Sequence, residues 1–313
     1  MIFEKELKEA DEFISAKKYK DALLIYDGIV NKISNPPADL MKKYAICLQE
    51  RLRYSESLKI TDDLLNKNPD DTDMLLNRCI CLGKQDKHKE AISQYEKILE
   101  IDKNYLKQIG YYAYLLERTD SSEKAEYYYK LAIEYEPDNL WYISHFAFFL
   151  QKLKRYSEAE VYYNEAIKRD SENTWLIKRY VIFISLMKGK EAAYLYYDNL
   201  IKGEPTNCNY YINLSELAII NDDRKKALEL LDKADGFEKP LVMELILLFY
   251  RGVYFASEED YESLDNTIEK IGILRPKYLS YIHRDFTDLN RYINTRFNDR
   301  QLIAYKRIMN SLN

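Results

Sequence analysis

The sequence predicts an all-α fold in which about eight helical hairpins stack side by side. Three observations support this fold class. The 313 residues include only 8 Gly and 7 Pro, which leaves little turn material for a β-rich protein. Hydrophobic residues make up 47% of the chain and charged residues 32%, a balance that suits amphipathic helices. Small residues also recur with a period of 34 residues, which is typical of stacked repeats.

Three columns of residues recur in step along the chain. The first holds small residues, most of them alanine: Ala22, Ser57, Ala91, Ala125, Ala159, Ala193, Ala227 and Leu264. The second, twelve residues earlier, holds small or fairly small residues: Ala10, Ala45, Cys79, Ala113, Ala147, Val181, Ser215 and Gly252. The third, four residues after the first, is mostly tyrosine: Tyr26, Thr61, Tyr95, Tyr129, Tyr163, Tyr197, Leu231 and Ile268. Residues four apart share a helix face, so the first and third columns predict one buried side of one helix.

The columns divide the chain into repeats of two helices each. Prolines near the repeat ends support the division, because proline stops or begins a helix: Pro36, Pro69, Pro137, Pro205, Pro240 and Pro276. The expected repeats are 3–36, 38–71, 72–105, 106–139, 140–173, 174–207, 208–241 and 245–278. Small residues where two helices cross let their axes approach to about 8–10 Å. Residues 277–313 leave the columns and are expected to form a basic helical cap, because a stack of repeats needs a polar end.

The chain resembles the tetratricopeptide repeat over residues 3–276. The resemblance rests on a small residue, an alanine, an aromatic residue and a terminal proline that recur at this period. The resemblance implies a right-handed superhelix whose first helices line a concave groove. It also implies a non-enzymatic scaffold or adaptor that binds a partner protein or peptide there. Trp141 and Trp175 lie slightly earlier than the usual tryptophan of the family. A scaffold of an RNA-processing complex, built from half-a-tetratricopeptide repeats, is therefore the alternative.

Helix geometry selects the residues expected to face this groove. A rotation of about 100° from the buried stripe of the first helices leads to positions that are largely aromatic or cationic. They are Tyr111, Tyr114, Arg118, Trp141, Ser144, His145, Phe148, Trp175, Lys178 and Arg179. Aromatic and Arg side chains are typical anchors of protein interfaces. The same positions could instead pack against the neighbouring repeat.

The family's carboxylate clamp, which grips the C-terminal carboxylate of a bound peptide, is matched only in part. Lys42, Asn77 and Lys107 have the expected residue types at their places. Ile46 and Tyr111 depart from the pattern, and they remove an amide donor and a guanidinium fork respectively. The resemblance therefore predicts a weak, partial clamp.

Charge and hydropathy bear on the class of partner. The net charge of −5 does not provide the basic field that nucleic-acid binding usually needs. The segment from Arg275 to Asn313 is basic, with eight Lys or Arg against three Asp, and it could bind an acidic partner or RNA. The most apolar stretch, 241–255, contains Glu244 and Arg251 and is too short to span a bilayer. The start of the chain lacks the apolar core of a secretory signal, so we expect a cytoplasmic protein of unspecified oligomeric state.

The sequence predicts no catalytic residue, cofactor site or metal site. His283, Arg284, Asp285 and Asn290 have the spacing of a protein-kinase catalytic loop. The 23 residues after Asn290 contain neither of the motifs that follow this loop in a kinase, so we interpret the match as coincidence. The three histidines lie in different repeats, and the four cysteines show no metal-binding spacing.

Overall fold

The computed structural model describes residues 3–119, 121–275 and 286–312, and the regular structure in these ranges is entirely helical. The predicted all-α class of packed hairpins is confirmed. The chain divides into two compact units, Met1–Glu165 and Ala166–Asn313, with the boundary inside helix α10. No helix in the described part of the chain combines the length and the apolar character needed to cross a membrane.

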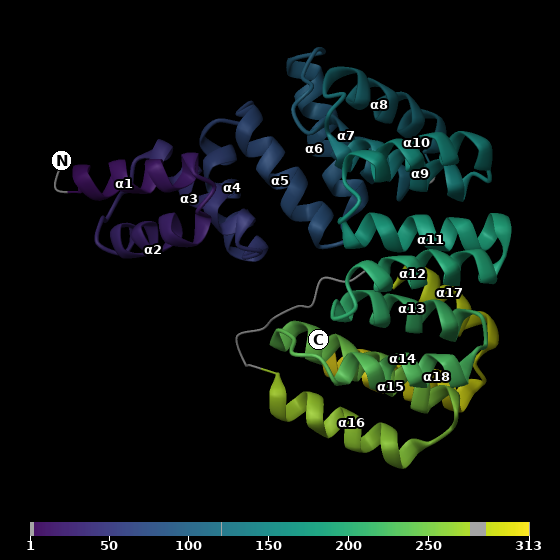
Figure 1. Ribbon diagram of the computed structural model, residues 1–313. Helices are drawn as coiled ribbons and strands as arrows, with labels where there is room; N and C mark the ends of the chain where they lie inside the picture. The colour runs from purple at the N-terminus through teal and green to yellow at the C-terminus, as the bar shows by residue number, and fades with distance from the viewer. Residues whose placement is uncertain (1–2, 120, 276–285, 313) are drawn as a thin grey trace. The chain divides into compact units, whose positions relative to one another are not determined.

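Unit 1 is a series of antiparallel helical hairpins (Figure 1). Its helices are α1 Glu4–Ser15, α2 Tyr19–Val30, α3 Ala38–Glu50, α4 Tyr54–Lys67, α5 Thr72–Lys84, α6 His88–Ile101, α7 Ile109–Glu117, α8 Ser122–Tyr135, α9 Leu140–Lys152 and α10 Tyr156–Arg169. Odd-numbered helices are the first of each hairpin and even-numbered helices the second. Each first helix from α3 to α9 also packs against the second helix of the preceding hairpin, so one hairpin covers the apolar side of the next.

The three sequence columns form the buried centre of both units. Every member of the first column is fully buried, and the second column is buried throughout. The third column is buried except at Ile268, which is only partly covered. Small side chains thus lie where helices cross, and tyrosines fill the space beside each crossing.

Four first helices begin at an Asp or Asn that recurs in step with the 34-residue period. The side chains of Asp71, Asn139, Asn173 and Asn207 each accept a backbone N–H in the first turn of α5, α9, α11 and α13. Tyr105 occupies this place before α7 and cannot cap in this way. Helix α7 instead begins only at Ile109, after Gln108 in the left-handed region at φ 58°, and it has 9 residues.

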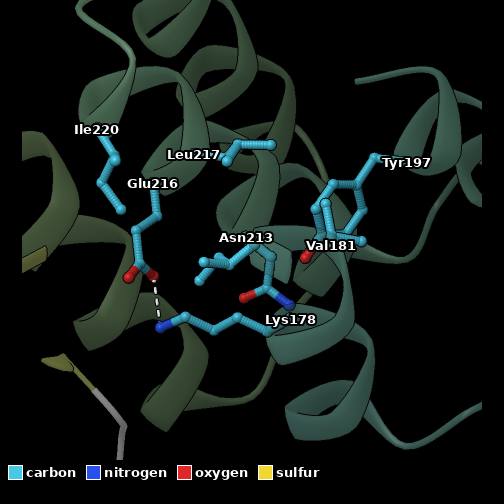
Figure 2. Close-up of a pocket in the computed structure, with 8 residues that line it drawn as sticks. Lys178, Val181, Tyr197, Asn213, Glu216, Leu217 and Ile220 are labelled. Atoms are coloured by element: carbon cyan, nitrogen blue, oxygen red, sulfur yellow. Dashed lines mark ion pairs between the residues drawn. The ribbon is translucent and has the colours of Figure 1, made fainter. Parts of the chain in front are cut away.

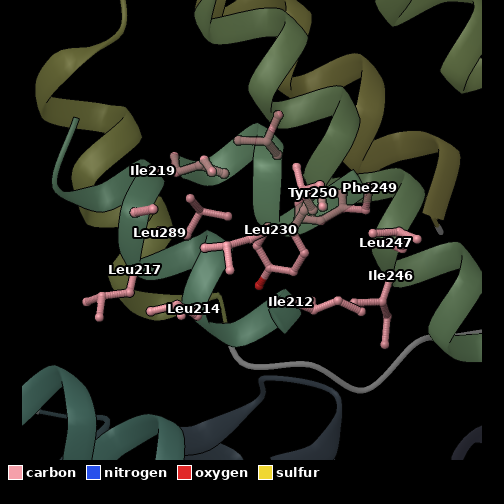
Figure 3. Close-up of a cluster of buried hydrophobic side chains, with 14 of the residues drawn as sticks. Ile212, Leu214, Leu217, Ile219, Leu230, Ile246, Leu247, Phe249, Tyr250 and Leu289 are labelled. Carbon is pink, nitrogen blue, oxygen red and sulfur yellow. The ribbon is translucent and has the colours of Figure 1, made fainter. Parts of the chain in front are cut away.

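Unit 2 continues with three further hairpins and then changes its packing. Its helices are α11 Thr174–Lys188, α12 Lys190–Gly203, α13 Cys208–Ile220, α14 Arg224–Asp235, α15 Leu241–Ser257, α16 Tyr261–Leu274, α17 Thr287–Arg296 and α18 Asp299–Leu312. Helix α18 packs against α15 and α16, whereas α17 packs against α13. The core of this unit joins residues of α13, α14 and α15 to Leu289 of α17 (Figure 3).

The division into eight repeats and a cap stays a prediction. Helix α15 begins at Leu241, four residues before the last expected repeat. The first part of the expected cap, 277–285, lies outside the described residues, and so do three members of the kinase-like motif, His283, Arg284 and Asp285.

Candidate protein-binding surface

Four of the predicted groove residues form a partly exposed cluster in unit 1. This aromatic surface consists of Tyr114 from α7 and Trp141, His145 and Phe148 from α9. Helix α9 is fixed at its start because Asn139 Oδ1 accepts the backbone N–H of Trp141 at 3.1 Å. Positions 141, 145 and 148 follow one another at four- and three-residue steps, so they share a face of α9.

The rings of the aromatic surface hold one another in place. Trp141 and His145 are stacked, with ring centroids 3.8 Å apart and planes 21° apart. Tyr114 meets both edge-on, at centroid distances of 6.2 Å to Trp141 and 6.2 Å to His145. His145 Nδ1 also lies 2.8 Å from the carbonyl oxygen of Trp141. Trp141 is 38% exposed, so a large and already ordered apolar side chain faces solvent.

Cationic side chains border the aromatic surface. The ammonium group of Lys152 lies 5.9 Å from the ring centroid of Phe148 and 2.7 Å from the carboxylate of Glu117. The hydroxyl of Tyr129 donates to the other oxygen of Glu117 at 2.8 Å, so this carboxylate is fully engaged within the unit. Arg118 is exposed at the end of α7. The charge of Lys152 beside Phe148 is therefore neutralised by Glu117, and Arg118 follows Tyr114 by one helical turn.

Two other predicted residues of unit 1 lie beneath this surface. Tyr111 is buried, stacks on Tyr114 at a centroid distance of 5.9 Å and lies under Lys84. Burial raises the pKa of the Tyr111 phenol above its usual value. Ser144 is buried and donates to the carbonyl of Leu140 at 2.6 Å. Both residues support the aromatic surface from below.

The predicted residues of unit 2 are largely covered. Trp175 is half-buried, and the guanidinium of Arg179 lies 5.9 Å from its ring centroid. Lys178 is buried and pairs with Glu216 at 2.8 Å (Figure 2), and Tyr250 donates to the same carboxylate. Arg179 is buried and donates to Asp288 of α17. Sequence reasoning missed Glu216 and Asp288, and no sequence signal links Asp288 to a residue 109 positions earlier.

The residues of the partial carboxylate clamp are bonded within unit 1. Lys42 pairs with Asp71 at 2.6 Å and Lys107 with Asp73 at 2.9 Å. Asn77 is buried, and its amide oxygen accepts the hydroxyls of Ser57 and Thr61. All three residues therefore have partners within unit 1, and the partial clamp stays a prediction.

Two hollows among the described residues lie beside ion pairs. The cavity between α11 and α13, next to the Lys178–Glu216 pair, measures about 10 Å³, which is room for one water molecule. A larger open depression of about 520 Å³ in unit 1 contains the ion pair of Arg78 with Asp62. Burial raises the pKa of the Cys81 thiol to about 11, which disfavours the reactive thiolate. No three His, Cys, Asp or Glu among the described residues are grouped to hold a metal ion.

Close packing of Gly110 against Tyr142 sets the spacing of the two helices that carry the aromatic surface. A Cβ atom at Gly110 would lie 2.3 Å from two ring carbons of the buried Tyr142. Gly110→Ala is therefore expected to push α7 from α9, to lower the free energy of unfolding by about 1–3 kcal/mol and to change the fluorescence of Trp141. Gly28→Ala is the control, because nothing lies within 4 Å of its Cβ, and it should stabilise slightly. Chemical denaturation of the two variants tests this, and equal stability would contradict it.

Two family models match parts of the sequence. Residues 145–173 match the tetratricopeptide repeat, and residues 11–110 match the coatomer epsilon subunit. No curated protein sequence matches the chain significantly.

Solved structures resemble the chain over most of its length. A tetratricopeptide repeat protein from Parabacteroides merdae aligns with a TM-score of 0.59 and 15% identity, over 85% of this chain and 98% of that one. PilW, a type IV pilus biogenesis factor, aligns with a TM-score of 0.57 and 14% identity, over 67% of this chain and 97% of that one. A chain of the Cut9–Hcn1 hetero-tetramer of the APC/C aligns with a TM-score of 0.54 and 14% identity, over 98% of this chain and 55% of that one. The predicted resemblance is thus confirmed: this chain is built from tetratricopeptide-type hairpins and has the fold of the tetratricopeptide repeat proteins.

Proposed function

We propose that this chain is a non-enzymatic scaffold that binds a segment of a partner protein on the aromatic surface of unit 1. The observation that carries the proposal is the stack of Trp141 on His145 beside Tyr114, with Trp141 38% exposed. Aromatic side chains that are ordered before binding lose little conformational freedom on binding, and they dominate interface energies. A cytoplasmic location, expected from the sequence, belongs to the same proposal.

The border of the surface indicates the chemistry of the bound segment. Arg118 is exposed one helical turn after Tyr114, whereas Lys152 is neutralised by Glu117. A segment with one apolar or aromatic anchor and one acidic side chain fits this arrangement, because the anchor covers Trp141 and the carboxylate faces Arg118.

The alternative of an RNA-processing scaffold depends on the basic C-terminal segment. In the described part of that segment, Arg291 lies 3.5 Å from Asp288 and Arg307 lies 2.7 Å from Asp265. Asp265 weakens the positive field that would attract RNA, whereas Asp288 also balances the charge of Arg179. The contacts therefore favour a protein partner.

The match of residues 11–110 to the coatomer epsilon subunit supports a narrower candidate, a subunit of a vesicle coat. In that case the partner is another coat subunit, and it should co-purify with the chain in a fixed ratio. If no coat subunit co-purified with the chain, the vesicle-coat candidate would be wrong, and the broader scaffold proposal would be unaffected.

Substitution of the aromatic surface tests the proposal. The tagged chain, the Tyr114→Ala/Trp141→Ala variant and the Tyr127→Ala variant are purified from native cells, and bound proteins are identified by mass spectrometry. Tyr127 is 62% exposed on the second helix α8 and provides the matched control. With the purified partner, the double variant should bind at least about 30-fold more weakly, the loss expected for a central anchor, and Tyr127→Ala should bind normally. Equal binding by all three proteins would overturn the proposal.

A further inference from the structure

Helix α17 covers one side of unit 2. This side, the first-helix face of unit 2, is the side of α11, α13 and α15 that carries Arg179, Glu216 and Tyr250. Helix α17 packs against α13, and Asp288 in it pairs with Arg179 of α11. The ring of Phe286, just before α17, lies 4.7 Å from that of Phe249 in α15. One helix of ten residues with its leading residue therefore contacts all three first helices.

The apolar contacts of α17 come from one side of the helix. Leu289 and Ile293 are fully buried and belong to the same cluster as Leu214 and Leu217 of α13. Figure 3 shows Leu289 together with Leu214 and Leu217. The opposite side, which includes Arg291, Asn294 and Arg296, is exposed. Helix α17 thus lies on unit 2 as an amphipathic helix lies on a complementary surface.

The polar contacts fix the position of α17 along this face. The side chains of Arg179 and Asp288 are 1% and 6% exposed, and the guanidinium donates to the carboxylate. Tyr292 donates to Asp222, in the turn between α13 and α14. A buried ion pair contributes little more to stability than apolar residues of the same volume would, but it strongly disfavours any placement that separates the charges. These contacts therefore select one helix in one register.

Helix α17 also stands outside the stacking order of the hairpins. Helix α18 takes the place beside α15 and α16 where the next first helix would pack. Helix α17 lies instead on the face formed by the first helices themselves. Its position is that of a bound segment and not of a further repeat.

We infer that the first-helix face of unit 2 is a helix-binding surface that α17 occupies as an internal ligand. Its external partner is an amphipathic helix with the pattern of α17: an Asp, a Leu directly after it, and a Tyr and an Ile four and five positions after the Asp. Such a helix competes with α17, so unit 2 binds it only when α17 leaves. This inference is independent of the aromatic surface of unit 1, and Tyr114→Ala/Trp141→Ala should leave it unaffected.

A charge exchange tests the inference on the full-length chain. Arg179→Asp sets a carboxylate against Asp288 and should release α17, because like charges in contact repel strongly. The probe is a fluorescent synthetic peptide of residues 286–298 carrying Asp288→Arg. It should bind Arg179→Asp at least 10-fold more tightly than it binds the unsubstituted chain. The control Arg251→Asp reverses a charge that pairs with Asp232 and Asp235 of α14, and it should bind the probe no more tightly than the unsubstituted chain does. Equal binding to the three proteins, or no binding to a folded Arg179→Asp variant, would overturn the inference.

Hydrogen exchange of the unsubstituted chain tests, without any variant, whether α17 opens separately from the hairpins. Backbone amides of α17 should exchange at least 10-fold faster than those of α13 and α15, because α17 opens separately from the hairpins. An excess of the unsubstituted 286–298 peptide should raise the exchange of α17 further while α11 and α13 stay protected. Exchange of α17 at the rate of α13 and α15, unchanged by the peptide, would show that α17 is part of the cooperative core and not a ligand.

Discussion

Replacing Glu216 by alanine is expected to lower the free energy of unfolding of unit 2 by about 3–5 kcal/mol. The side chain of Glu216 is 1% exposed, and it lies 2.8 Å from the ammonium group of Lys178, which is 7% exposed. Tyr250, also fully buried, donates its hydroxyl to the same carboxylate. The variant would remove this carboxylate and leave the lysine charge and the tyrosine hydroxyl buried. Breaking a buried ion pair by removing one partner is strongly destabilising, because the remaining charge is no longer compensated.

Two comparisons separate this effect from the loss of any surface charge. Glu258→Ala removes a carboxylate from the exposed pair with Arg224 and should cost less than about 1 kcal/mol. Lys178→Met/Glu216→Leu/Tyr250→Phe replaces the whole group by apolar side chains and should recover most of the lost stability. Denaturant unfolding can be followed through Trp175 in a Trp141→Phe background, since the chain has only 2 tryptophans. A Glu216→Ala variant as stable as Glu258→Ala would contradict the expectation.

The fold could be predicted from the sequence because its determinants are local and repeated. A close helix crossing favours a small side chain, so alanine recurs where the two helices of most hairpins meet, and Ala91, Ala125 and Ala159 are each fully buried. The same repetition predicts helices of known length joined by short turns. The late start of α7 was not predicted, because it depends on the absence of a single capping side chain at Tyr105.

The candidate site could be predicted only where no distant part of the chain covers it. Helix geometry assigns Trp141 and Arg179 to similar sides of their first helices, and it carries no information on what packs there. Trp141 is partly exposed, whereas Arg179 is buried against Asp288, which is 109 residues away in sequence. Contacts of this range are set by the path of the whole chain and leave no periodic signal. Binding at the aromatic surface of unit 1 therefore stays a prediction. In unit 2 the corresponding side of the first helices is covered by α17.

Truncation of a tyrosine in the third column is expected to destabilise unit 1 about as strongly as Glu216→Ala destabilises unit 2. Tyr95 is fully buried in α6, and its ring stacks on Tyr112 of α7 at a centroid distance of 4.5 Å. Its hydroxyl donates to the carbonyl of Lys107 at 2.8 Å, in the segment that leads into α7. Tyr95→Ala would open a cavity between two hairpins, and the packed structure around it would relax only partly. The substitution should therefore lower the free energy of unfolding by about 3–5 kcal/mol.

The hydroxyl and the ring of Tyr95 contribute separately, and two further variants distinguish them. Tyr95→Phe keeps the packing and removes one hydrogen bond, so it should cost about 1 kcal/mol. Tyr127→Ala, at a site 62% exposed, should change stability by less than about 0.5 kcal/mol. If Tyr95→Phe cost as much as Tyr95→Ala in denaturant unfolding followed through Trp141, the hydrogen bond to Lys107 would be the main contribution of the column. The expected ranking instead makes the volume of the ring decisive, which explains why Leu231 replaces tyrosine in the column without loss of burial.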